Sequence, residues 1–297
     1  MPAISTEALT KSYGERVGVR DVSLQVDEGS VFGFIGPNGA GKTTTIRMLL
    51  GFLKPTSGRA RVLGQDAWSE SAAIKRDVGY LPGDLRLPGW MDGRKALRVV
   101  GAARSRDLTA PGHELAEYFA LELGVPVRDM SRGMRQKLGL ILTLAHRPRL
   151  LVLDEPTSAL DPLTQERLCS LLRERAEGGA TVFFSSHVLS EVQDLCERVA
   201  FVRSGEIIVD TTLAELRSQV RRDVTIEWRE SPPPPQLADG LLEVYRQTET
   251  VWHSRLVGTT PELLDWLSGR PVADLAVEPP DLDSLFMRFY RDEVEGA

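Results

Sequence analysis

The chain has few cysteines and no excess of positive charge. Its two cysteines, Cys169 and Cys196, have no spacing typical of a metal site and are too few for a disulfide framework. We therefore expect them to be reduced core residues. The formal net charge is −6 and the isoelectric point is about 5.4. Because proteins that bind nucleic acid usually carry a basic surface, we expect no nucleic-acid partner.

Long apolar runs are missing as well. The longest runs, such as Val31–Ile35 and Leu150–Leu153, fall far short of the ~20 residues that a bilayer-spanning helix needs. The N-terminal residues lack the apolar core of a signal peptide. Any work at a membrane is therefore expected to depend on a partner protein.

Apolar patterning predicts an α/β fold for residues 1–218. Near the start, Val22, Leu24 and Val26 alternate with polar residues, which indicates a half-buried antiparallel strand. Nearly continuous apolar runs, typical of strands covered on both faces of a mainly parallel sheet, occur at 31–35, 150–153 and 181–184. Residues 85–148 have helix-length stretches and no strong strand pattern, so we predict a mostly helical insertion there. A further helix is expected with Asp161 as its N-cap and Pro162 in its first turn.

Residues 219–297 are expected to form a small α+β accessory domain. Strand-like patterns occur at 224–228, 241–246, 250–257 and 272–277. The proline run Pro232–Pro235 indicates a stiff surface connection. A helix is expected with Thr260 as its cap, Pro261 at its start and Gly269 at its end, and an amphipathic helix is expected from Asp281.

A phosphate-binding loop is indicated by the pattern Gly-x-x-x-x-Gly-Lys-Thr, which directly follows the first apolar run. Glycines let backbone N–H groups approach phosphate oxygens, and the helix that follows presents its positive N-terminal end. We expect Lys42 to reach the β- and γ-phosphates of ATP and Thr43 to supply a hydroxyl to Mg²⁺. The residues expected to bind the nucleotide here are Gly36, Pro37, Asn38, Gly39, Ala40, Gly41, Lys42, Thr43 and Thr44.

Two acids and a histidine follow the other two apolar runs. Asp154 and Glu155 come directly after the second run, and His187 follows the third. Because ligands collect at the carboxyl ends of strands in α/β sheets, we expect all three side chains to meet at the phosphate-binding loop. Asp154 is expected to hold Mg²⁺, and Glu155 to polarise a water for in-line attack on the γ-phosphate. His187, which alone is more typical of a satisfied polar residue, becomes a catalytic candidate beside Glu155 and Lys42.

The order of these motifs resembles the ATP-binding cassette of ABC transporters, over residues 3 to about 217. A signature-like segment, Ser131–Gln136, lies some twenty residues before the acidic pair. The resemblance implies that Tyr13 stacks on adenine, and that Ser131 and Gly133 contact the γ-phosphate of ATP held by a second subunit. It also implies that Asp161 communicates across the interface between the two subunits.

The resemblance implies partners and a place in the cell. The partners are a second cassette, expected to be an identical chain in a head-to-tail dimer, and an integral membrane permease. The chain itself would be cytoplasmic and peripheral on the inner face of the cell membrane. Its tail, with Leu282–Phe286, resembles that of the ABC-2-type export subfamily, which includes antibiotic-resistance exporters. ATP hydrolysis to ADP and phosphate would then power export, and the alternatives are a non-transport ABC-type ATPase or a weakly hydrolysing regulatory switch.

Three departures from the family pattern affect these expectations. Arg132 and Met134 stand where the usual signature has glycine and glutamine, and Gly83 stands where a loop normally ends in glutamine. Either Gly83 only shapes a turn after Pro82, or hydrolysis is slow because water and metal are imperfectly positioned, with Asp84 or a bound water as a partial substitute.

The insertion also contains a basic stretch, which comprises Arg94, Lys95, Arg98, Arg104 and Arg106. We expect it to be a solvated helix face, or else a face toward anionic headgroups or an acidic loop of a membrane partner.

Overall fold

The computed structural model describes residues 1–193, 195–219 and 221–278. The chain divides into two compact units, and the first of them is Met1–Leu213. The division falls at the start of helix α8 (Leu213–Gln219), a few residues before the boundary expected after residue 218, which stays a prediction. The helix expected from Asp281 and the segment Leu282–Phe286 lie outside the described residues.

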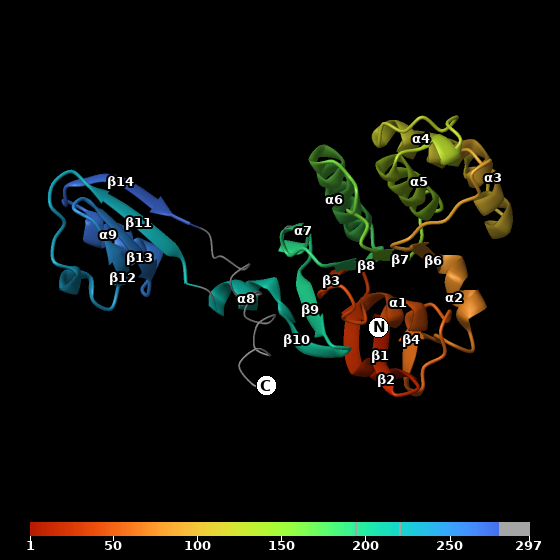
Figure 1. Cartoon of the computed structure of the whole chain (residues 1–297), viewed down its shortest axis with the longest axis horizontal. Helices are drawn as coiled ribbons and strands as arrows, with labels where there is room; N and C mark the ends of the chain where they lie inside the picture. Colours follow the sequence, from red (N-terminus) through yellow and green to blue (C-terminus); the bar gives the residue numbers. More distant parts are fainter. Residues whose placement is uncertain (194, 220, 279–297) are drawn as a thin grey trace. The chain divides into compact units, whose positions relative to one another are not determined.

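A six-stranded mixed sheet forms the centre of the first unit (Figure 1). Its strands, in spatial order, are β10 (Glu206–Thr212), β9 (Arg198–Arg203), β3 (Val31–Ile35), β8 (Thr181–Ser186), β7 (Leu150–Asp154) and β6 (Val78–Leu81). Only β10 runs antiparallel to its neighbour, and the other pairs are parallel. All residues of β3, β7 and β8 are buried, which explains their continuous apolar character. The α/β class and these three strands are confirmed.

A second, antiparallel sheet packs against the first through a shared apolar core. Its strands are β2 (Arg16–Asp27), β1 (Pro2–Tyr13), β4 (Ser57–Val62) and the short β5 (Gln65–Asp66). Along β2, Val22, Leu24 and Val26 are buried and the residues between them are exposed, as the alternation predicts. The core joins these side chains to Phe34 of β3 and Val152 of β7.

The helices of the first unit fall into two sets. Those that follow strands of the sheets are α1 (Lys42–Leu49), α2 (Ser71–Asp77), α6 (Pro162–Glu177) and α7 (Ser190–Gln193). The expected insertion contains α3 (Gly93–Arg104), α4 (Thr109–Tyr118), the short 3₁₀ helix η1 (Val127–Asp129) and α5 (Arg132–Leu144), and Figure 1 shows α3, α4 and α5 grouped together. None of the helices within the described ranges is long and apolar enough to cross a bilayer.

The basic stretch of the insertion divides into two parts, which corrects the expectation of one solvated face. Arg94, Lys95 and Arg98 are exposed on α3. Arg104 instead donates hydrogen bonds of 3.0–3.2 Å to the carbonyls of residues 75, 76 and 78, where α2 ends and β6 begins. Arg106 donates to the carbonyl of His146 at 3.0 Å. A guanidinium offers five donors in one plane. Arg104 therefore ties the insertion to the edge of the sheet, and Arg106 ties two segments of the insertion to each other.

The second unit contains a four-stranded antiparallel sheet in the order β12-β13-β11-β14. The strands are β12 (Leu242–Gln247), β13 (Val251–Leu256), β11 (Asp223–Trp228) and β14 (Val272–Val277). The unit also contains most of α8, η2 (Pro235–Ala238) and α9 (Thr260–Leu267). Trp228 and Trp252 lie in its core. The cap of α9 is Thr259 rather than Thr260, because the Thr259 hydroxyl and the Glu262 carboxylate form a reciprocal capping box.

Candidate functional site

Strand register brings the predicted site residues together. Ile35 at the end of β3 pairs with Ser186 of β8, and Ser185 pairs with Asp154 at the end of β7. Three parallel strands therefore end at the same edge of the sheet. The segments that follow them carry the phosphate-binding loop, the acidic pair and His187, so side chains that are far apart in sequence lie at one site.

The loop between β3 and α1 has the backbone that close approach to phosphate requires. Gly39 and Gly41 have φ angles of 83° and 103°, in the region that favours glycine. A Cβ atom at Gly41 would lie 2.8 Å from the carbonyl oxygen of Gly18, closer than real Cβ contacts allow. Gly41 is also the N-cap of α1, so the positive end of this helix faces the loop. The loop therefore fits a polyphosphate.

Lys42 is buried within this loop and has several oxygen partners. Its Nζ donates to the carbonyls of Gly36 at 2.7 Å and Pro37 at 3.1 Å. The Glu155 carboxylate lies 3.4 Å from the same Nζ. A buried ammonium needs such partners, and phosphate oxygens are suitable replacements for them.

Thr43 and Asp154 place two oxygen atoms where a divalent cation could bind. The Thr43 hydroxyl donates to Asp154 Oδ2 at 2.8 Å, and the Ser185 hydroxyl donates to the other carboxylate oxygen at 2.7 Å. Hydroxyl and carboxylate oxygens, completed by waters and substrate phosphates, are the ligands that Mg²⁺ prefers. The residues present therefore fit the predicted metal site. Sequence reasoning did not select Ser185, although paired serines at the end of an apolar strand were visible.

Glu155 lies between the two other catalytic candidates. Its Oε2 lies 3.3 Å from Nδ1 of His187, and its Oε1 faces Lys42. Its backbone has a φ of 51°, in the left-handed region that costs a non-glycine residue about 1–3 kcal/mol. The backbone N–H of Glu155 donates to the carbonyl oxygen of Ser185 at 3.1 Å, which helps to hold this conformation.

Tyr13 lies at a cavity of about 610 Å³ that is also lined by Gly39, Gly41, Lys42 and Thr44. Its ring packs beside Gly18, where an added Cβ would lie 2.9 Å from the Tyr13 Cε2 atom. Half of the tyrosine is exposed. A half-exposed ring beside the phosphate-binding loop suits stacking on a base, because stacking needs only one open π face.

Ser131, Gly133 and Asp161 line neither of the two cavities that flank Lys42 and Thr43, among the residues that the structure describes. The Ser131 hydroxyl caps α5 by accepting a hydrogen bond from the N–H of Met134 at 3.1 Å. Asp161 caps α6, and its hydrogen bonds from the hydroxyl and then the N–H of Thr164 lower the pKa of the Asp161 carboxyl. Ser131, Gly133 and Asp161 thus lie outside both of these cavities.

The segment of residues 156–161 is tied to the start of α5. Arg132 donates to the Ser158 hydroxyl at 3.0 Å, and Gln136 donates to the Pro156 carbonyl at 2.9 Å. A Cβ at Gly133 would lie 2.8 Å from the Ala159 carbonyl oxygen, so glycine permits this close approach. The arginine that departs from the usual signature therefore has a partner within the chain.

Gly83 lies against the candidate metal site. It lines a cavity of about 790 Å³ together with Thr43, Tyr80 and Asp154. Burial, and to a smaller extent the charge of Asp154, raises the pKa of the Tyr80 hydroxyl to about 12. A Cβ at Gly83 would lie 3.5 Å from Asp154 Oδ2, an ordinary contact distance. Its backbone lies outside the left-handed region, so the local conformation does not require glycine. Asp84 lines the same cavity, but its carboxylate pairs with Arg86 at 2.7 Å in a largely exposed ion pair.

Gly83→Gln is expected to raise kcat at saturating Mg-ATP. The added amide would point toward Asp154 and could orient the metal or the attacking water, and such a polar contact is worth about 1–3 kcal/mol. Asp84→Ala should lower kcat only slightly, because its carboxylate must first leave Arg86. ATPase assays on the purified chain, with circular dichroism as a control for folding, test both. If the folded glutamine variant is no faster, Gly83 is only a turn residue.

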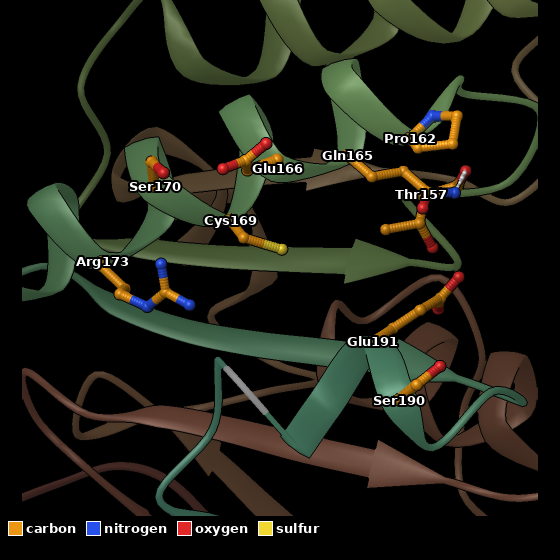
Figure 2. A pocket seen from close by; sticks show the side chains of 9 residues that line it. All are labelled: Thr157, Pro162, Gln165, Glu166, Cys169, Ser170, Arg173, Ser190 and Glu191. Carbon is orange, nitrogen blue, oxygen red and sulfur yellow. Dashed lines mark hydrogen bonds between the residues drawn. The ribbon is translucent and has the colours of Figure 1, made fainter.

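A separate cavity of about 540 Å³ lies between α6 and α7 (Figure 2). Thr157 and Gln165 line one part of it and Glu191 another, and Figure 2 shows the sulfur of Cys169 directed toward its interior. Cys169 is only partly buried, so the expectation of a core residue is wrong for this cysteine. Cys196 is buried as expected, and burial raises the pKa of its thiol.

Comparisons with known proteins show which family this chain is similar to. The family model described as ABC transporter matches residues 19–158. The daunorubicin resistance ATP-binding protein DrrA3 of Streptomyces coeruleorubidus is 32% identical over 98% of this chain and 96% of its own length. The bacitracin transport ATP-binding protein BcrA of Bacillus licheniformis is 35% identical over 74% of this chain and 72% of its own length.

Solved structures show the same fold. The structure of an ATP-binding subunit of an ABC transporter matches 73% of this chain and 92% of its own with a TM-score of 0.68 and 27% identity. The ATP-binding cassette MJ0796, in a dimeric post-hydrolysis state bound to ADP and Pi, matches 71% of this chain and 98% of its own with a TM-score of 0.64 and 24% identity.

Proposed function

This chain belongs to the ABC transporter family of ATP-binding proteins and is an ABC ATPase, and we propose that it powers export through a separate membrane permease. The single observation that supports hydrolysis most strongly is the position of Glu155. Its carboxylate lies 3.4 Å from the ammonium of Lys42 and 3.3 Å from the imidazole of His187. The proposed base therefore lies beside both the proposed phosphate-binding cation, Lys42, and the proposed orienting group, His187.

In the proposed reaction, water attacks the γ-phosphorus of ATP in line with the departing ADP. A new P–O bond forms as the bond between the γ-phosphorus and its bridging oxygen breaks. Glu155 accepts the proton of the water, Lys42 holds the β- and γ-phosphates, and His187 orients the γ-phosphate and the base. The side chain of Tyr13 would stack on the adenine.

Mg²⁺ is proposed to bind to Thr43 and Asp154. When bound, the ion would neutralise phosphate charge. The chain's own contribution is to hold the carboxylate of Asp154 in one orientation, through hydroxyl donors on both of its oxygens. Free rotation of this carboxylate is thereby restricted before any cation arrives.

A second copy of the chain is the proposed partner for the signature segment. The positions of Ser131, Gly133 and Asp161 outside the chain's own nucleotide cavities support a head-to-tail dimer, in which each signature segment completes the other chain's ATP site. The exposed N-terminus of α5 would supply the Ser131 hydroxyl and its positive helix end to the γ-phosphate. An identical partner is the simplest arrangement, because one chain carries both halves of the site.

Export and location rest on the relatives. Two similar proteins are named for bacitracin transport and daunorubicin resistance, which supports a role in moving drug-like compounds out of the cell. Since no described helix could span a bilayer, the proposed route lies in a separate permease. The chain would then work at the cytoplasmic face of the membrane.

Ser131→Arg is expected to block ATP-induced dimerisation while leaving ATP binding by the single chain nearly normal. A long cation at this exposed position would clash with the nucleotide of the second chain, but Ser131 lines neither of the cavities that flank Lys42 and Thr43 of its own chain. Light scattering with Mg-ATP, in a Glu155→Gln background that prevents turnover, measures the dimer.

Loss of the Ser131 cap also costs about 1 kcal/mol of helix stability, which a matched control must separate. Ser131→Thr keeps a hydroxyl for the cap and should still dimerise. A normal ATP-induced dimer with arginine at this position would refute the head-to-tail arrangement.

A further inference from the structure

The turn that carries His187 is closed by the side chain before it. Ser186 is buried at the end of β8, and its hydroxyl accepts a hydrogen bond from the N–H of Val188 at 2.9 Å. The same hydroxyl lies 2.5 Å from the Glu191 carboxylate and 3.1 Å from the Val188 carbonyl. A hydroxyl has one proton, and the nearer, charged acceptor is the stronger one. Ser186 therefore donates to Glu191.

The main chain of Ser186 is anchored separately. Its carbonyl accepts a hydrogen bond from the N–H of Gly36, at the start of the phosphate-binding loop, at 3.2 Å. The backbone of Ser186 is thus fixed to the nucleotide site, while its side chain is fixed to α7 through Glu191. These two anchors determine how the chain turns immediately before His187.

His187 is much more exposed than the serine before it. Its side chain is 45% exposed, and its described polar contact is the one between Nδ1 and Glu155 at 3.3 Å. The position of the ring depends on the backbone that carries it, and the turn at Ser186 sets the course of that backbone. The closed turn therefore fixes the backbone position from which the imidazole reaches Glu155.

Glu191 lies at the edge of a cavity rather than in the close-packed core. Figure 2 shows its carboxylate at the cavity between α6 and α7, near the end lined by Thr157. Gln165 lines the same cavity and donates to the carbonyls of Thr157 and Leu160, both at 3.3 Å. Because the cavity is open, truncating Glu191 removes a hydrogen bond without leaving a buried void.

We propose that Glu191 is a positioning residue for His187, acting through the hydroxyl of Ser186. Glu191 lines the cavity between α6 and α7 and neither of the two cavities that flank Lys42 and Thr43. Its carboxylate fixes the Ser186 hydroxyl, which closes the turn and so sets the distance between the imidazole and Glu155. This inference rests on the proposed role of His187 in hydrolysis.

The test is a double-mutant cycle on the full-length chain, measured as steady-state ATP hydrolysis. Glu191→Ala and Ser186→Ala are each expected to lower kcat about tenfold, the effect of losing one charge-assisted hydrogen bond, with KM for ATP changed less than about twofold. Glu191→Gln keeps an acceptor oxygen and should retain most of the rate. In a His187→Ala background, Glu191→Ala should lower kcat by less than about twofold more, because the positioned group is already gone.

Controls separate the outcomes. Glu166→Ala removes another carboxylate at the same cavity, on α6, and should leave kcat unchanged. An undiminished effect of Glu191→Ala in the His187→Ala background, or an unchanged kcat in the single variant, overturns the inference. If His187→Ala itself keeps the parental rate, the proposed role of His187 fails instead. Circular dichroism and ATP binding confirm that each variant is folded.

Discussion

Glu155→Gln should abolish ATP turnover while ATP binding is preserved. The amide has the same shape and leaves the strained backbone unchanged, but it cannot accept a proton from the attacking water. Losing a positioned general base costs on the order of 10²-fold or more in rate. Lys42 keeps its carbonyl partners and remains able to hold phosphate. The measurements are kcat at saturating Mg-ATP and nucleotide affinity by equilibrium binding.

The same variant should accumulate as an ATP-bound dimer, because the ATP held between the two chains of the proposed head-to-tail dimer would not be hydrolysed. Glu166→Gln, an amide substitution at the cavity between α6 and α7, is the matched control and should keep the parental rate. Turnover of the Glu155→Gln chain within about threefold of the parent would rule out Glu155 as the base.

Lys42→Ala is expected to weaken nucleotide binding and turnover together. One charge-assisted contact to phosphate is worth about 1.5–3 kcal/mol, so ATP affinity should fall roughly 10- to 150-fold. The loss should be larger for ATP than for adenosine, which has no phosphate to bind. Calorimetric titration with both ligands measures the difference.

A second substitution separates charge from packing at this buried site. Lys42→Met keeps an apolar stem in the loop and removes only the ammonium, so it should lose as much ATP affinity as alanine does. Thermal melting of the nucleotide-free variants reports the cost of leaving the Gly36 and Pro37 carbonyls without their donor. Parental affinity in both variants would remove the phosphate-binding role of Lys42.

Continuous apolar runs made β3, β7 and β8 predictable, and with them the edge of the sheet where the site lies. Such runs are specified locally, since strands buried on both faces tolerate few polar residues. Strand β6 was missed because it is short and contains Gly79, which is needed where an added Cβ would lie 2.7 Å from the Thr143 carbonyl oxygen. That constraint comes from α5, far along the chain.

It was harder to predict which hydrogen-bond partner a given side chain has. Thr259 and Thr260 both have a hydroxyl that can cap a helix, and only the reciprocal bond with Glu262 selects the first. In the same way, the sequence shows that Arg104 and Arg106 are basic but not that backbone carbonyls lie within their reach. The Glu191–Ser186 bond was missed for a related reason, since neither residue type is distinctive on its own.

The hydrogen bonds of Arg104 have a mechanical consequence. They make the C-terminal end of α3 a pivot, since turning it would break bonds to three carbonyls at once. A helix of 12 residues is about 18 Å long, so a tilt of about 10° around this pivot moves its far end by about 3 Å. Arg94 and Lys95 lie at that far end. A force applied at this end of α3 would act on β6 through the bond between Arg104 and the Val78 carbonyl. Strand β6 leads to Gly83.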